Sequence, residues 1–141
     1  DSDGTLCFAP RKYIEGMIQT YNQHFGKNPC PYQSPLEKGD PPKADTSEEL
    51  DLDGIQLYQS LIGSLQWVIQ LGCLDITTAV MTLSRFHANP RQGHLDWIKC
   101  IYGYLLKFKH SAIHINTNEP DFSNLPNKHY DWEYSVYRGA K

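Results

Sequence analysis

The chain has 141 residues, which suits one domain, or one small domain with tails. Its hydrophobic content of 40% is slightly low for a compact globule, and its nine prolines predict that part of the chain is loop or linker. A run of about 18 apolar residues, which would predict a transmembrane helix, does not occur, and the N-terminus lacks the pattern of a signal peptide. The net charge of −3 by itself argues weakly against a nucleic-acid-binding protein.

The charges are distributed unevenly along the chain. Residues 36–57 hold seven acids and two bases, residues 54–74 hold no charged residue, and residues 75–110 hold five bases and two acids. This pattern predicts an acidic linker, then a neutral helix, then a mildly basic helical half. Ordinary surface charge would explain the basic excess equally well.

The chain opens with a turn signal. Asp3-Gly4, directly before the strand-forming residues 5–8, predicts a β-hairpin, because a type I′ turn needs positive φ at both central residues. Only the second strand of that hairpin is present here. We therefore expect the first strand to lie upstream and the chain to be a fragment, and the absence of an N-terminal Met agrees with this.

Apolar residues recur at helical spacing in four segments, which predicts four helices. Pro10 favours the start of the first helix, and Gly26 favours its end. Asp75 is a suitable N-cap for the third helix, which Asn89 and Pro90 end. The predicted helices cover residues 11–25, 53–71, 75–89 and 93–109.

The links between these helices predict their packing. Residues 28–51 hold five of the nine prolines and most of the acids, so we expect a loop or linker there, mobile in part. Short links join the other three helices, which should form one bundle, with the first helix separate or only loosely docked. The residues expected to be buried together in the bundle are Leu61, Leu65, Val80, Leu83, Ile98, Ile101 and Leu105.

The predicted fold class is mainly α. It consists of a small helical bundle with a partial β-hairpin strand at the N-terminus. A short strand at residues 112–115 and an irregular tail follow the bundle.

Motifs of common enzyme classes are absent: there is no G-x-S-x-G, P-loop, H-E-x-x-H or dinucleotide-binding fingerprint. The cysteines form no C-x-x-C pair, so we expect reduced, structural thiols and disfavour a metal site or disulfides. A small cysteine hydrolase, with a loop histidine near a cysteine, is a minor alternative. The four cysteines are Cys7, Cys30, Cys73 and Cys100.

The second predicted helix has an unusual outer face. Its apolar residues gather on one side, and the opposite side is polar but uncharged, with Gln59, Gly63 and Trp67 in it. A glycine in mid-helix costs about 1 kcal/mol relative to Ala, so something should approach this backbone closely. A packed helix would explain the face, and so would the minor groove of a nucleic-acid duplex.

Five motifs, in order and at close spacing, resemble the reverse transcriptase of copia-type (Pseudoviridae) retrotransposons. That family's typical run is Y-x-x-L-I-G-S-L-x-Y/W, R-P-D-I, L-S-R-F, P-x-x-x-H and L-R-Y-L-K. Farther upstream, residues 12–14 and 34–35 are similar to its K-Y-I and T-P. The resemblance covers roughly residues 4–115. The counterparts of the five motifs are residues 58–67, 73–76, 83–86, 90–94 and 102–106.

The resemblance implies a position between the polymerase palm and RNase H, in the thumb and the start of the connection. In retroviral relatives the corresponding thumb helix carries Q-x-x-x-G-x-x-x-W and lies along the primer in the minor groove. The implied segments are 1–27, the end of the palm hairpin and the first helix; 28–52, the Pro-rich acidic linker; 53–110, the thumb bundle; and 111–141, the start of the connection.

The implied function is to hold the primer–template, an RNA/DNA or DNA duplex, without catalysis. The expected nucleic-acid-binding residues are Gln59, Gly63 and Trp67, and the candidates for phosphate contact are Lys99 and Lys107 on one side of the fourth helix. The catalytic carboxylates are expected outside this segment, in the palm upstream and RNase H downstream. No cofactor is therefore expected here, and the Mg²⁺ belongs to the parent polymerase. The other partner is the rest of the Pol polyprotein; no membrane is expected, and the location is intracellular, in cytoplasmic virus-like particles and also the nucleus.

Two of the five motifs depart from the family pattern. Cys73-Leu74 replaces Arg-Pro, Gly103 replaces Arg, and Leu106 replaces Lys. Loss of bases weakens phosphate binding, and either a divergent lineage or a decaying copy would explain it. A helical protein-interaction module without a nucleic-acid role is the alternative function.

Overall fold

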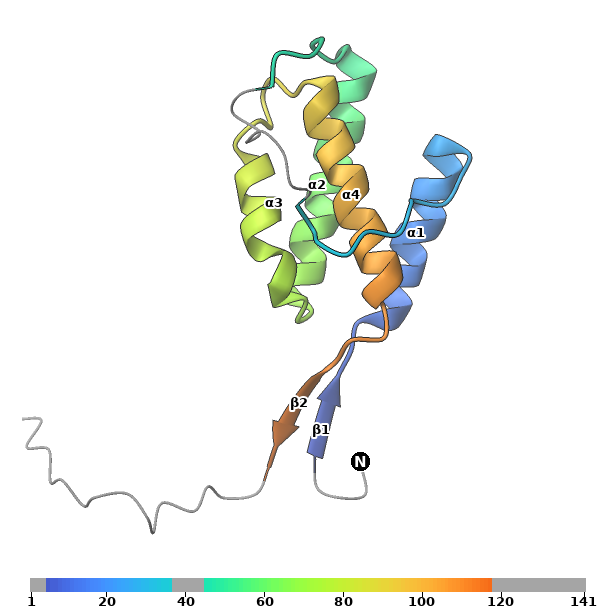
Figure 1. The fold of residues 1–141 in the computed structure, drawn as a ribbon, viewed down its shortest axis with the longest axis vertical. Coiled ribbons are helices and arrows are strands. Elements are labelled where there is room, and N and C mark those ends of the chain that lie inside the picture. Colours follow the sequence, from blue (N-terminus) through green and yellow to red (C-terminus); the bar gives the residue numbers. More distant parts are fainter. Residues whose placement is uncertain (1–4, 37–44, 118–141) are drawn as a thin grey trace, which may run out of the picture.

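The computed structural model describes residues 5–36 and 45–117. These residues form a mainly α fold with a two-stranded antiparallel ribbon at one end, which confirms the predicted fold class (Figure 1). None of the described helices is long and apolar enough to cross a membrane. The elements in chain order are β1 (Thr5–Phe8), α1 (Arg11–Phe25), α2 (Leu52–Gln70), the 3-10 helix η2 (Leu74–Ile76), α3 (Thr77–Ser84), α4 (Gln92–Phe108) and β2 (Ile113–Asn116).

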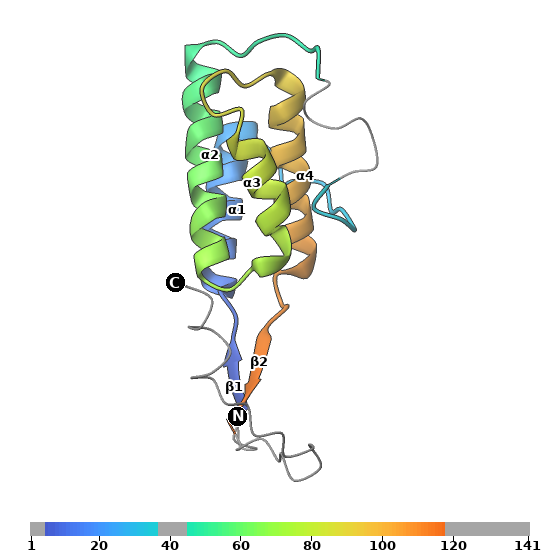
Figure 2. The same ribbon diagram turned by 90° about the vertical axis from the view of Figure 1, so that its left-hand side faces the viewer.

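The four α-helices enclose one apolar core. Turned by 90°, the bundle shows α2 and α4 on opposite sides, with α3 in front of them and α1 behind (Figure 2). All seven residues that the sequence predicts to be buried together lie in this core. The largest side chains in it include Tyr58 and Tyr102, and the hydroxyl of Tyr58 donates a 2.8 Å hydrogen bond to the Leu83 carbonyl.

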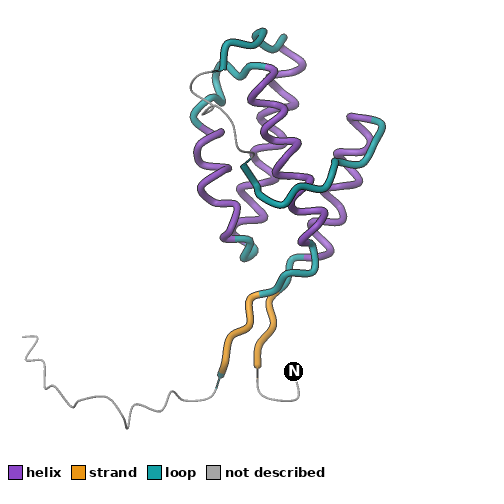
Figure 3. Tube along the Cα trace, in the orientation of Figure 1, coloured by secondary structure: helices purple, strands orange, loops and turns teal. Residues whose placement is uncertain are grey.

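Helix α1 is part of the core, so the prediction that it is separate or loosely docked is wrong. Its apolar stripe, which is Ile14, Met17, Ile18 and Tyr21, is buried against α2 and α4. Leaving these side chains in water would forfeit roughly 25 cal/mol for each Å² of apolar surface. The proline-rich segment does not prevent docking, because residues 28–36 cross over α4 and allow α1 to stay beside it (Figure 3).

Strand β1 pairs with β2, a partner that was not predicted from the sequence. The Asp3-Gly4 turn itself lies outside the described residues. Leu6 pairs with Ile115 and Phe8 with Ile113, and alternation places these four side chains on one face of the ribbon, where they are exposed. The pairing joins segments that are distant in sequence, which no local turn signal could predict.

The third helix is shorter than predicted, and Asp75 is not its N-cap. Asp75 lies inside η2, and its carboxylate accepts a 2.6 Å hydrogen bond from the hydroxyl of Tyr104 on α4. Helix α3 ends at Ser84, and turns continue the chain toward Pro90. The other predicted helices agree with the structure to within one residue at each end.

Candidate nucleic-acid interface

The outer face of α2 is exposed to solvent and carries no charge between residues 54 and 74. Gly63 and Trp67 are exposed on it, and Gln59 is half-buried at its edge. The Trp67 side chain is 56% exposed, so it does not belong to the core. No described residue lies within 4 Å of a Cβ built on Gly63. A packed helix was one explanation of this face, but no helix of the described chain packs on it at Gly63 and Trp67.

The edge of the face toward α3 is fixed by glutamine side chains. The Gln59 amide donates to the carbonyl of His87 at 3.1 Å, and the Gln66 amide donates to the Ser84 hydroxyl at 3.1 Å. These bonds hold the side chains of Gln59 and Gln66 in place, so this edge of the face is preorganised. An open groove of about 380 Å³ lies here, lined by Gly63, Gln66, Trp67, Ile69, Gln70 and Met81.

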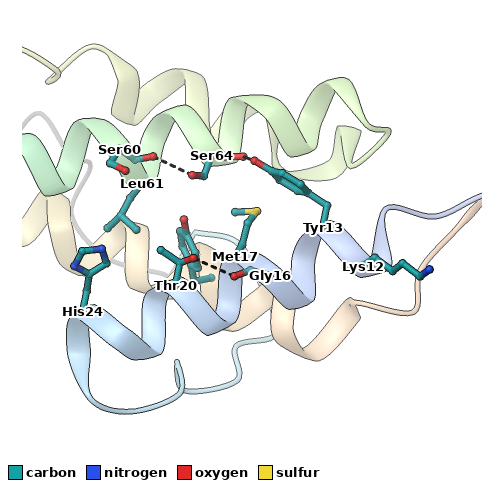
Figure 4. Close-up of a pocket in the computed structure, with 10 residues that line it drawn as sticks. Lys12, Tyr13, Gly16, Met17, Thr20, His24, Ser60, Leu61 and Ser64 are labelled. Atoms are coloured by element: carbon teal, nitrogen blue, oxygen red, sulfur yellow. Dashed lines mark hydrogen bonds between the residues drawn. The ribbon is translucent and has the colours of Figure 1, made fainter.

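The edge toward α1 is a second groove, of about 330 Å³, lined mostly by small and hydroxyl-bearing residues (Figure 4). The hydroxyl of Tyr13 reaches the Ser64 carbonyl at 3.5 Å, and the Ser64 hydroxyl donates to the Ser60 carbonyl at 3.1 Å. In the same view His24 points toward α2, and Lys12 lies at the other end of the groove. This edge was not predicted from the sequence, because α1 was expected to be separate.

Lys99 and Lys107, the expected phosphate contacts, lie on α4 rather than beside the α2 face. Lys99 Nζ is 2.6 Å from the Asp96 carboxylate and 5.3 Å from the centre of the Phe25 ring of α1. Lys107 Nζ is 5.7 Å from the ring of Phe108 in its own helix. Since α4 and α2 occupy opposite sides of the bundle (Figure 2), the structure does not bring these lysines together with Gln59, Gly63 and Trp67.

A cluster of polar contacts, here called the clamp, joins the end of the acidic linker to the start of α4. It was not predicted from the sequence. The Ser47 hydroxyl accepts the Gly93 N–H at 2.8 Å, and Arg91 donates to the Ser47 carbonyl and to the Glu49 carboxylate. His94 is 2% exposed, and its Nδ1 accepts the Arg91 N–H at 3.0 Å. The P-x-x-x-H motif therefore has a structural role here. Its contact with Ser47 could not be predicted, because the two lie far apart in the sequence.

Asp45 is the charged centre of this clamp. Burial raises the pKa of Asp45, but hydrogen bonds from the N–H and hydroxyl of Ser47, together with His94 and Arg91, hold it below its ordinary value of 3.8. His94 Nε2 lies 3.8 Å from the Asp45 carboxylate. The ionised carboxylate thus joins the linker to α4.

The cysteines are all free, but the expectation of buried structural thiols holds only in part. Cys100 is buried and Cys73 half-buried, whereas Cys7 and Cys30 are exposed. Burial, with the nearby Asp75, raises the pKa of Cys73 to about 11. That shift disfavours the thiolate that a cysteine hydrolase needs. In the described residues, no group of three or more His, Cys, Asp and Glu side chains could hold a metal ion.

Comparison with known proteins shows that the chain is similar in sequence to part of a transposon polyprotein. It is 33% identical over 107 residues to the Retrovirus-related Pol polyprotein from transposon TNT 1-94 of Nicotiana tabacum. The match covers 71% of this chain and 8% of that polyprotein, so the chain spans a small part of its relative's length. No protein-family model and no solved structure matches. The similarity supports the predicted origin in a retrotransposon Pol polyprotein.

Proposed function

We propose that this chain, which is similar to part of a retrotransposon Pol polyprotein, is the thumb segment of its reverse transcriptase and holds the primer–template duplex. The observation that carries the proposal is the outer face of α2, which is uncharged and on which Gly63 and Trp67 are exposed. Side-chain amides can bond the acceptors at a groove edge, and an aromatic ring can lie on a sugar. Such contacts read shape rather than sequence, as a polymerase that slides along any template requires.

In this proposal the chain binds nucleic acid without catalysing a reaction. The described residues offer no carboxylate cluster that fits a two-metal centre, so Mg²⁺-dependent chemistry would belong to neighbouring parts of the polyprotein. Those parts, the palm upstream and RNase H downstream, are its protein partners. Its location would be that of the polyprotein, in cytoplasmic particles and the nucleus.

A duplex-binding assay with fluorescent RNA/DNA and DNA duplexes tests the proposal. Trp67→Ala should weaken binding about ten-fold, which corresponds to about 1.4 kcal/mol, because it removes the apolar area that lies on the duplex. Leu6→Ala, which removes an exposed apolar side chain from the ribbon, is the matched control and should leave the affinity unchanged. Equal affinity of wild type and Trp67→Ala would refute the proposal.

The second candidate is a protein-interaction module, and the groove between α2 and α3 favours it. Trp67 and Met81, both more than half exposed, line this groove and could pack against an apolar helix of a partner. Absence of duplex binding at low salt, together with a Trp67-dependent complex with another part of the polyprotein, would favour this second candidate.

A further inference from the structure

The bundle carries two exposed bases on the elements that border the α2 face. Lys12 lies in the first turn of α1, and Arg85 lies directly after α3. Neither has a carboxylate within salt-bridge distance among the described residues. By contrast, Arg11, Arg91, Lys99 and Lys109 each have an acidic partner within 4.0 Å. Lys12 and Arg85 are thus free to bind an external anion.

The chain neighbours of these two bases contact α2 at the same level, on its opposite edges. Tyr13, which follows Lys12, reaches the Ser64 carbonyl, and Ser84, which precedes Arg85, accepts from Gln66. The two anchor points on α2 are only two residues apart and lie between Gly63 and Trp67. Helix α2 stands between α1 and α3 (Figure 2), so one base borders each side of the uncharged face.

The distance between α1 and α3 suits the two strands that border a groove of a duplex. Packed helices lie about 8–10 Å apart, so the axes of α1 and α3 are at most roughly 16–20 Å apart across α2. This range is wide enough to straddle a minor groove about 6 Å wide. An exposed Lys has a flexible four-carbon stem, and an Arg guanidinium can bind a phosphate through two N–H groups.

We infer that Lys12 and Arg85 contact phosphates of the two strands that border the groove occupied by the α2 face. This inference rests on the proposed function, and it replaces Lys99 and Lys107 as the phosphate contacts. Lys99 is already paired with Asp96, and both lysines belong to α4, which lies across the bundle from α2. The duplex is then held by neutral contacts in the middle and by one positive charge at each edge.

The salt dependence of duplex binding tests this inference. The affinity of the full chain for a fluorescent RNA/DNA duplex is measured between about 50 and 200 mM salt, and log K is plotted against log salt concentration. Lys12→Gln and Arg85→Gln should each reduce the steepness of this line by about 1, and the double variant by about 2. Lys99→Gln and Lys107→Gln are the matched controls, and their lines should equal that of the wild type.

The outcomes separate the inference from the proposed function. If the wild type binds the duplex but only Lys99→Gln and Lys107→Gln flatten the line, or no single variant does, the inference is overturned and the proposed function stands. If the wild type shows no duplex binding, both fail. Circular dichroism melting of each variant checks that the substitutions, all at exposed or half-buried side chains, leave the fold intact.

Discussion

Two mid-helix glycines, Gly63 and Gly103, have opposite surroundings. A Cβ on Gly63 would meet nothing within 4 Å. A Cβ on Gly103 would collide with the carbonyl oxygen of Cys30, because the segment of residues 28–36 crosses α4 at this point. The family pattern has Arg at the position of Gly103, so the path of this segment depends on the departure from that pattern.

Substitution by Ala should therefore change stability in opposite directions at the two sites. Gly63→Ala should raise the free energy of unfolding by about 0.5–1 kcal/mol, because it improves helix propensity without a clash. Gly103→Ala should lower it by about 1–3 kcal/mol, because the crossing segment must move. Equilibrium urea unfolding measures both, and Gly16→Ala, at another open position of a helix, is the control for the gain. A loss of stability in Gly63→Ala would contradict the open surroundings of Gly63.

The clamp at Asp45 predicts a dependence of stability on pH. Because the pKa of Asp45 is held below its ordinary value of 3.8 in the folded chain, its ionised form stabilises the fold fully above that value. This contribution should disappear as pH falls below 3.8 through the folded pKa. Asp45→Asn should cost about 1–3 kcal/mol near neutral pH, and the difference from wild type should shrink in acid. Urea unfolding of both proteins at a series of pH values measures this difference in stability. A difference that grows as the pH falls would contradict the prediction.

At the scale of elements, hydrophobic periodicity predicted the existence and bounds of most helices, because that signal is local. It predicted the exposure of Trp67 for the same reason, since the α2 stripe alone decides which side faces the core. Which face of α4 is covered depends on the docking of α1, which no local pattern encodes. The position of Lys99 against α1, and the position of Lys12 at the groove between α1 and α2, could therefore not be predicted.

The docking of α1 can be tested through its most buried aliphatic residue. Ile14 is 2% exposed, so Ile14→Ala should lower the free energy of unfolding by about 2–4 kcal/mol, as does a comparable change in any well-packed core. Leu65→Ala in α2 provides the reference for a core position. If Ile14→Ala cost less than about 0.5 kcal/mol while Leu65→Ala cost several, helix α1 would be loosely docked after all.

At the scale of the whole molecule, the bundle begins and ends at the ribbon. Strands β1 and β2 lie side by side at one end, so the described chain enters and leaves the bundle at the same place (Figure 1). Helix α2 runs along one side of the bundle, and Gly63 and Trp67 are exposed on its outer face. This arrangement leaves room for a duplex beside the bundle while the ribbon joins it to flanking sequence.

The most direct test of the central claim is a map of the surface that contacts the duplex. The ¹⁵N-labelled chain is titrated with an unlabelled RNA/DNA duplex, and the changes in amide chemical shift are followed by NMR. We expect the largest changes at the Trp67 indole N–H and at amides near Gln59 and Gly63, with smaller changes near Lys12 and Arg85. Changes confined to the outer side of α4 or to the ribbon, with the Trp67 indole unmoved at saturation, would contradict it.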